Sequence, residues 1–261
     1  EVFVIDERHH PVGTCALSWI LTTPRSVKLT DVMKRDQTLI PVTMDQEEAA
    51  LMFQKYALIS AAVVDESGRL VGQITVDDIV HIIQEEASED ILRLSGAGDG
   101  DINEPILLTV RTRLTWLVVN LGTALVAASV VGMFQGAIAR FALLAVLMPI
   151  VSGMGGNAGT QTLAVVVRAM ATNQLTSSNT VRMILRELRI ATANGATLGL
   201  LIGGGTALMF GNPLLGLVIG SAMVINNLVA GLAGIMVPVT LDRLKVDPAV
   251  SSAVFVTMAT D

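Results

Sequence analysis

Cysteine is nearly absent from this chain, and its scarcity excludes whole classes of fold and site. Cys15 is the single cysteine among 261 residues, so the chain cannot form an internal disulfide framework or a cluster of thiolates around a metal. We interpret Cys15 as a buried structural thiol. The sequence also lacks a recognisable nucleophile–base pair and a phosphate-binding loop, so we expect a protein that is not an enzyme.

Acidic residues are scarce in the second half of the chain. Residues 1–113 hold 19 of the 23 Asp and Glu but only 10 of the 17 Lys and Arg, which gives them a net charge of −9, whereas residues 114–261 carry +3. The first half would repel phosphates, which argues against nucleic acid as a partner and favours cations. The second half consists of long apolar runs. This asymmetry predicts two domains in two different solvents.

The two ends of the sequence lack the usual signals of a complete protein. Glu1 is followed at once by an apolar strand pattern, with no initiator Met and no signal peptide. The apolar segment that opens at Pro248 reaches only to Asp261, short of the roughly 20 residues of a spanning helix. We therefore expect a fragment of a longer protein.

A repeat with an offset of 59 residues organises the acidic half. Residues 4–20 recur as residues 63–79, with Asp6 matching Asp65 and Gly13 matching Gly72. Each copy has the pattern of a strand, a polar turn, a second strand and a helix. Between the copies, Asp45 can cap a helix that begins at Gln46. Two such units, each with an uncovered apolar face, are expected to pack together.

This repeat resembles a tandem pair of cystathionine-β-synthase (CBS) domains whose first copy lacks its opening elements. The resemblance is carried by Leu29-Thr-Asp-Val-Met-Lys, by the strand pair within residues 61–75, and by Val76-Asp-Asp-Ile-Val. It implies an adenosine nucleotide such as ATP bound at a Thr-x-x-Asp turn, here Thr75 and Asp78. The alternative is that these two residues only cap the following helix.

An acidic helix is predicted to leave this module over residues 79–94. Glu86, Glu89 and Asp90 stand at i, i+3 and i+4, so their carboxylates share one face and repel one another. A divalent cation would turn that repulsion into attraction, and the alternative is a solvated acidic face. Residues 96–101, rich in glycine, are expected to form a flexible connector.

The second half predicts five membrane-spanning helices in a lipid bilayer. Arginine and lysine flank alternate loops, which by the positive-inside rule places those loops, and with them the acidic module, in the cytoplasm. The last run is the segment cut short at Asp261. The apolar runs cover residues 114–134, 137–171, 190–210, 213–239, and 249 onward.

Two features do not fit helices that only face lipid. The second run holds Pro149 followed by four glycines, together with Asn157 and Gln161, which weakens the helix and favours a pore lining over a packing kink. The other is Asp261, about 20 Å along the last run at 1.5 Å per residue, with Thr257 one turn earlier. A carboxylate at that depth indicates a functional site.

Together these motifs resemble the MgtE family of magnesium channels along the whole chain. The family has Pro, Thr and Glu where Val254, Met258 and Gln135 stand here, and its N-terminal superhelical domain has no counterpart. The motifs that carry the resemblance are Glu86-Ala-Ser-Glu-Asp, Pro149 with Gly155-Gly-Asn-Ala-Gly-Thr-Gln, Arg168-Ala-Met-Ala-Thr, Arg186-Glu-Leu, Val246-Asp-Pro-Ala-Val and Thr260-Asp.

The resemblance implies a homodimer in which Asp261 of both subunits forms a site for hydrated Mg²⁺. Gly156, Asn157 and Thr257 would line its path. It also implies that intracellular Mg²⁺ gates the pore through metal sites on the acidic side, at Asp78, Glu86, Glu89, Asp90 and Asp247.

We therefore expect an α+β CBS-domain pair with a truncated first copy over residues 1–80. A connecting helix and linker follow over 81–113, and a transmembrane bundle of five helices, the fifth truncated, over 114–261. The expected function is Mg²⁺ import across the plasma membrane, with the CBS domains in the cytoplasm. The alternatives are a CBS-regulated transporter of another divalent cation or solute, and a membrane-anchored nucleotide sensor.

Overall fold

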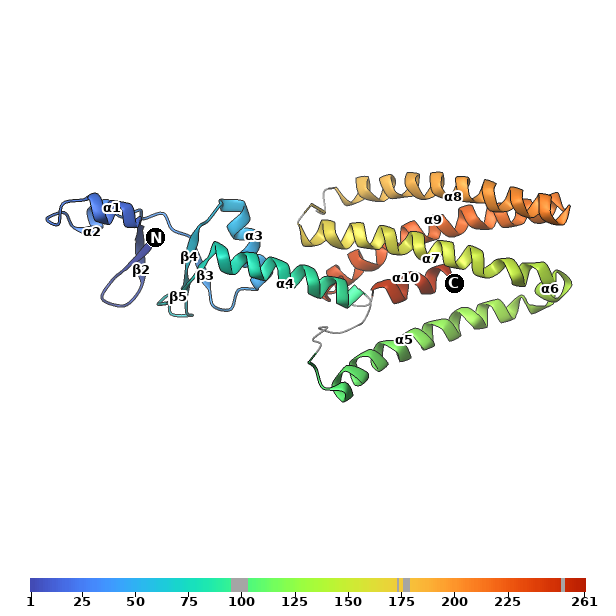
Figure 1. Cartoon of the computed structure of the whole chain (residues 1–261), viewed down its shortest axis with the longest axis horizontal. Coiled ribbons are helices and arrows are strands. Elements are labelled where there is room, and N and C mark those ends of the chain that lie inside the picture. The colour runs from blue at the N-terminus through green and yellow to red at the C-terminus, as the bar shows by residue number, and fades with distance from the viewer. Residues whose placement is uncertain (95–102, 173, 176–178, 250–251) are drawn as a thin grey trace. The chain divides into compact units, whose positions relative to one another are not determined.

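The computed structural model describes residues 1–94, 103–172, 174–175, 179–249 and 252–261, with only the backbone described at Asp90. The chain forms two compact units, Glu1–Ser88 and Glu89–Asp261 (Figure 1). The predicted glycine-rich connector at residues 96–101 lies outside the described residues.

The first unit begins with an antiparallel hairpin of β1 (Val2–Ile5) and β2 (Pro11–Cys15), followed by two short helices, α1 (Leu17–Thr22) and α2 (Leu29–Val32). Cys15 is buried at the end of β2, as predicted. Backbone hydrogen bonds in both directions between Thr14 and Lys34 tie the hairpin to the segment after α2.

A three-stranded sheet and two helices complete this unit. β3 (Leu39–Pro41) pairs in parallel with β4 (Ser60–Val64), which pairs antiparallel with β5 (Leu70–Thr75). Helices α3 (Gln46–Tyr56) and α4 (Val76–Leu94) supply Phe53 and Ile79 to a core with Ile40 and Ala61. Asp45 caps α3 as predicted, by accepting a hydrogen bond from the Glu47 amide at 2.9 Å.

The predicted repeat is visible in its turns. Asp6 accepts hydrogen bonds from the amides of Arg8 and His10, each at 2.8 Å, and Asp65 accepts them from Ser67 and Arg69, each at 2.9 Å. The donors are two and four residues after the aspartate in both hairpins, so the two copies share one turn geometry. The pKa of Asp6 is lowered mainly by the hydrogen bond from the His10 amide. The pKa of Asp65 is lowered mainly by a hydrogen bond from the Ser67 hydroxyl at 2.7 Å, together with the two amide bonds.

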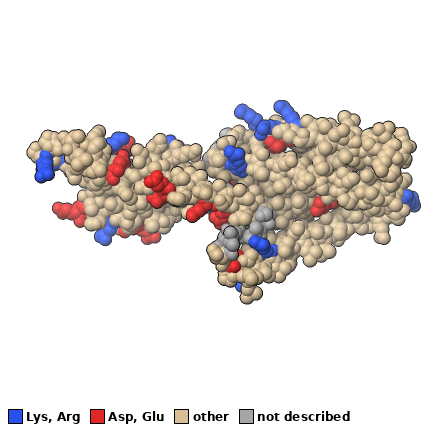
Figure 2. Space-filling view, viewed as in Figure 1, with Lys and Arg blue, Asp and Glu red and all other residues tan. Residues whose placement is uncertain are grey.

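The second unit is helical. Among the described residues, four helices are long and apolar enough to cross a membrane: α5, α7, α8 and α9. The helices are α5 (Ile106–Met133), α6 (Gln135–Arg140), α7 (Ala142–Ala171), α8 (Thr180–Phe210), α9 (Pro213–Arg243) and α10 (Ser252–Thr260). The predicted α+β module followed by a helical bundle is thus confirmed. On the face shown in Figure 2, charged side chains are sparse along these helices.

The predicted second span divides into two helices. The apolar run from residue 137 falls partly in α6, which ends at Arg140, and partly in α7. Phe141 between them has φ −129° and ψ 73°, outside the helical region. An unbroken apolar run does not reveal such a break, because hydropathy carries no information on backbone dihedrals.

Helix α7 runs without interruption through Pro149 and the glycines that follow it, so the expected weakening of this helix is not seen. Two of the glycines make room for neighbouring helices. A Cβ on Gly155 would lie 2.2 Å from the side-chain nitrogen Nδ2 of Asn226, and one on Gly159 would lie 2.4 Å from a methyl carbon of Val256. The glycines therefore allow α9 and α10 to approach α7 closely.

Glycines also bring α8 and α9 together within the chain. A Cβ on Gly203 would lie 2.5 Å from the carbonyl oxygen of Gly216, and one on Gly199 would lie 2.6 Å from that of Gly220. The four glycines form two motifs of the type Gly-x-x-x-Gly, at residues 199–203 and 216–220, and the motifs face each other across this helix pair.

Candidate functional site

Asp261, at the end of α10, meets Ser152 in the first half of α7. The Ser152 hydroxyl donates a hydrogen bond to Oδ1 of Asp261 at 2.6 Å, joining segments 109 residues apart in sequence. Sequence reasoning missed Ser152, although it stands inside the proline–glycine motif of α7.

Gly156 and Thr257 lie beside this pair. A Cβ on Gly156 would lie 3.8 Å from the Thr257 methyl carbon and 3.8 Å from the Thr260 hydroxyl, so the bare face of α7 here is turned to α10. The Thr257 hydroxyl donates to a carbonyl of its own helix at 3.0 Å. Asn157 is exposed, one position further along α7. The structure thus brings Asp261, Gly156 and Thr257 together along one helix contact.

The second acidic position, Asp247, lies before α10 and is bound to a cationic side chain. Its Oδ2 accepts a hydrogen bond from the Arg93 guanidinium, which also forms an ion pair with Glu89 one turn earlier on α4. Its Oδ1 accepts from the amide of Ala249 at 2.8 Å. Arg93 therefore joins two of the predicted sensor carboxylates, Glu89 on its own helix and Asp247, which lies 154 residues after Arg93 in sequence. The role of Arg93 was not predicted.

The remaining predicted sensor residues have separate surroundings. Glu86 accepts a hydrogen bond from the side-chain amide of Gln46 on α3, and the side chain of Asp90 lies outside the described residues. No group of three or more His, Cys, Asp or Glu placed to hold a metal ion is found in the described part of the chain.

Thr75 and Asp78 are joined at the start of α4. The Asp78 carboxylate accepts hydrogen bonds from the Thr75 hydroxyl at 2.7 Å and from the Thr75 amide at 2.9 Å. These two bonds lower the pKa of Asp78, the hydroxyl bond most. The amide contact is the reciprocal half of a capping box, so the helix-capping interpretation accounts for this pair.

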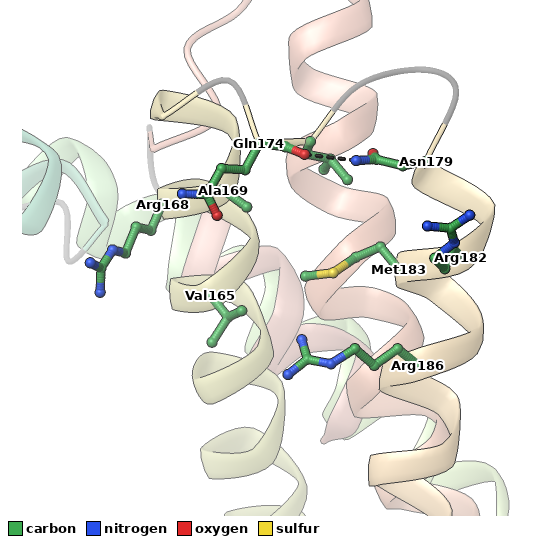
Figure 3. Close-up of a pocket in the computed structure, with 9 residues that line it drawn as sticks. Val165, Arg168, Ala169, Gln174, Asn179, Arg182, Met183 and Arg186 are labelled. Carbon is green, nitrogen blue, oxygen red and sulfur yellow. Dashed lines mark hydrogen bonds between the residues drawn. The ribbon is translucent and has the colours of Figure 1, made fainter. Parts of the chain in front are cut away.

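A cavity of about 420 Å³ lies between the end of α7 and the beginning of α8 (Figure 3). Arg168, Arg182 and Arg186 line it. Across its upper end, the side-chain amide of Asn179 donates a hydrogen bond to the backbone carbonyl of Gln174 at 2.8 Å. Its described lining contains no carboxylate, so this cavity is unsuited to a cation. The arginines mark this end of both helices as the side that the positive-inside rule places in the cytoplasm.

A CBS-type module followed by a bundle of apolar helices of spanning length defines a class of membrane protein. Residues 148–261 match the model of the MgtE family, described as divalent cation transporters, and residues 29–85 match that of the CBS domain.

The relatives agree with this class. The chain is 33% identical over 261 residues to the magnesium transporter MgtE of Bacillus subtilis (strain 168) and 34% identical over 260 residues to that of Enterococcus faecalis (strain ATCC 700802 / V583). The alignments cover all of this chain and 58% and 57% of those proteins, so the chain spans less than two thirds of their length.

The chain belongs to the MgtE family. A crystal structure of the cytosolic domain of the Mg²⁺ channel MgtE in complex with ATP matches 31% of this chain and 32% of that one, at 31% identity and a TM-score of 0.30. Because that match is partial, the family assignment rests on the sequence matches. The names of the relatives also agree with the prediction of a protein that is not an enzyme.

Proposed function

We propose that this chain is the regulatory and pore-forming part of a homodimeric Mg²⁺ transporter that imports the ion across the plasma membrane, with its CBS module in the cytoplasm. The observation that carries the proposal is the contact of Asp261 with Ser152, beside Gly156 and Thr257. This contact supports the proposal because it joins a carboxylate to a facing helix in a region that is otherwise almost free of acids.

The chemistry of this contact suits a hydrated Mg²⁺ ion. Mg²⁺ dehydrates reluctantly and is usually held by one or two carboxylates while it keeps several waters. One protomer supplies one carboxylate, Asp261, so two protomers around an axis would supply the pair. The hydroxyls of Ser152 and Thr257 and the exposed amide of Asn157 can bond to the waters of the ion.

The direction of transport follows from charge. A membrane potential of 100 mV, negative inside, favours inward movement of each elementary charge by about 2.3 kcal/mol, so a divalent ion gains about twice that on entry. A pore that binds the ion through carboxylates needs no other energy source to import it. Import is therefore the direction that the site and the potential support together.

Gating by intracellular Mg²⁺ is proposed to act through the carboxylates around Arg93. Arg93 holds Glu89 and Asp247 together in this structure, the arrangement that a bound cation would also favour. At high Mg²⁺ the ion would add to this attraction, together with Glu86, Asp90 and Asp78, and hold the pore closed. ATP, bound near Thr75 and Asp78, would shift the same equilibrium, because a ligand that prefers one state favours it.

The test of the pore is Mg²⁺ flux into proteoliposomes that contain the full-length protein. Asp261→Asn removes one charge per subunit without changing the side-chain size, and we expect flux to fall by about 10- to 100-fold, the value of a contact to a charged group worth roughly 1.5–3 kcal/mol.

Asp242→Asn is the matched control, because Asp242 is an exposed aspartate of the same unit, near the end of α9. This variant should conduct Mg²⁺ normally. Normal flux through Asp261→Asn would rule out the proposed pore site. Parallel assays with Mn²⁺, Co²⁺ and Ca²⁺ test whether another divalent cation is the preferred ion.

A further inference from the structure

A second polar cavity, of about 200 Å³, lies inside the helical unit among α7, α8 and α9. It shares no lining residue with the Asp261 contact. Side chains with oxygen atoms come from all three helices, whereas the described lining contains no sulfur or imidazole group. The polar residues that line it are Gln161 and Thr162 of α7, Glu187 and Asn194 of α8, and Asn227 of α9, with Arg186 at its edge.

Glu187 is the buried charge of this cavity. Its exposed fraction is 5%, and it is the only acidic residue between Glu104 and Asp242. Oε2 accepts a hydrogen bond from the Thr162 hydroxyl at 3.4 Å, and Oε1 lies 3.4 Å from the guanidinium of Arg186, whose side chain is 63% exposed. Both contacts are long. A carboxylate removed from water needs close partners, and these two leave it undercompensated.

Asn227 provides an independent sign of a missing ligand. It is fully buried, and its Nδ2 donates to the carbonyl of Met223 at 2.9 Å. That bond fixes the orientation of the amide, because a flipped amide would set two oxygen atoms against each other. Its Oδ1 has no hydrogen-bond partner among the described residues, although buried polar atoms in folded proteins are almost always satisfied. In one cavity, therefore, Glu187 has only two long contacts and Oδ1 of Asn227 has none.

We propose that this cavity binds a hydrated divalent cation, Mg²⁺ or Mn²⁺, within each protomer, at a site separate from the pore. Oxygen ligands without sulfur or imidazole suit these hard cations. A single carboxylate is sufficient, because Mg²⁺ usually retains several waters. The cavity volume accommodates them, since one water needs only about 10–15 Å³ of such space. The bound ion would join α7, α8 and α9 through Thr162, Glu187 and Asn227.

Arg186 affects how strongly the site would bind a cation. Its guanidinium contacts Oε1 of Glu187, whereas the Thr162 hydroxyl bonds to Oε2. A cation and Arg186 would therefore compete for the charge of Glu187. Because the arginine side chain is largely exposed, it can swing away when a cation binds. Removal of Arg186 should therefore strengthen cation binding, whereas removal of Glu187 should weaken it. A purely structural role for the pair would make both substitutions harmful.

The test measures Mn²⁺ binding by electron paramagnetic resonance to the full-length protein in lipid nanodiscs, with thermal unfolding as a second readout. We expect Glu187→Gln to lower the Mn²⁺ affinity of one site per protomer at least about tenfold, equivalent to about 1.4 kcal/mol. The rise in unfolding temperature that the ion causes at that site should disappear. Arg186→Gln and Asn227→Asp should each raise the affinity several-fold, results that misfolding cannot imitate.

Asp261→Asn should leave this binding intact, so failure of the pore proposal and failure of this inference can be told apart. Mn²⁺ binding that is the same in Glu187→Gln and in the unaltered protein would overturn the inference. Binding that changes in opposite directions in Glu187→Gln and Arg186→Gln supports it.

Discussion

Three aspartates of the α+β unit bond to residues close to them in sequence, whereas two contacts of the helical unit join polar groups that are far apart in sequence. Asp6, Asp65 and Asp78 all have partners two to four residues away. In the helical unit, Ser152 reaches Asp261 over 109 residues, and Asn226 donates to the Val151 carbonyl over 75 residues at 2.7 Å.

The difference follows from the surroundings of the two units. In a unit exposed to water, a carboxylate can be hydrated and serves mainly to fix turns and helix starts. Among apolar helices a polar side chain bonds either to a carbonyl of its own helix, as Thr257 does, or to a group on another helix, as Ser152 and Asn226 do. Contacts of the second kind mark places where helices meet, and such places can bind ions.

The largest expected effect tests whether the close contact of α8 with α9 is what brings distant polar groups together. Gly203→Ala would place a Cβ 2.5 Å from the Gly216 carbonyl oxygen, and this backbone atom cannot rotate away. We expect a loss of roughly 1–3 kcal/mol of stability from overpacking, measured by denaturant titration of the full-length protein in detergent.

Gly204→Ala is the matched control, because nothing lies within 4 Å of a Cβ at that position. It should be neutral or stabilise the helix by up to about 1 kcal/mol, the difference in helix propensity between glycine and alanine. Equal destabilisation by the two substitutions would show that the close contact of α8 with α9 is not what holds this part of the bundle together.

A second prediction concerns the long-range contact of Arg93 with Asp247. In Arg93→Gln the two carboxylates, Glu89 and Asp247, lose their shared cation, and the pair becomes a better site for Mg²⁺. We expect inhibition of flux at lower cytoplasmic Mg²⁺, by several-fold, because an exposed ion pair contributes up to about 1 kcal/mol. The measurement is flux against cytoplasmic Mg²⁺ in proteoliposomes.

Two comparisons sharpen this result. Neutralising Glu86, Glu89 and Asp90 together should leave flux high at Mg²⁺ concentrations that close the unaltered protein. Arg243→Gln, which removes an exposed charge at the end of α9, should not shift the inhibition curve. If inhibition were unchanged in both Arg93→Gln and the triple variant, the gating proposal would be wrong.

The smallest expected effect tests the local contacts of the α+β unit. Hydrogen bonds lower the pKa of Asp65 in the folded state, so this aspartate stabilises its turn above its unfolded pKa. That contribution is lost as the pH falls through the lowered folded value. Hydrogen exchange at the amides of Ser67 and Arg69, corrected for intrinsic rates, should therefore accelerate a few-fold on acidification.

Asp65→Ala should exchange rapidly at these two amides already at neutral pH. The neighbouring substitution Glu66→Ala should not accelerate exchange at these amides, because both amides donate their hydrogen bonds to Asp65. Acid-independent protection in the unaltered protein would mean that the carboxylate contributes nothing to the turn.

The sequence by itself determined what is local in this protein. The offset of 59 residues predicted both hairpins, Asp45 marked the start of α3, and long apolar runs predicted the four helices of spanning length. Each of these signals depends on residues a few positions apart, where the chain geometry is fixed by the backbone itself. The family motifs likewise pointed to Asp261, Gly156 and Thr257, which lie together along one helix contact.

Only the tertiary structure decided which groups meet. Sequence alone could not show that Ser152 holds Asp261, that Arg93 joins Glu89 to Asp247, or that Gly155 and Gly159 admit neighbouring helices rather than weaken their own. Nor could it show that Glu187 and Asn227, 40 positions apart, line one cavity. The physical reason is that helix periodicity fixes the face of each residue within one helix, whereas the contacts between helices depend on how their surfaces pack.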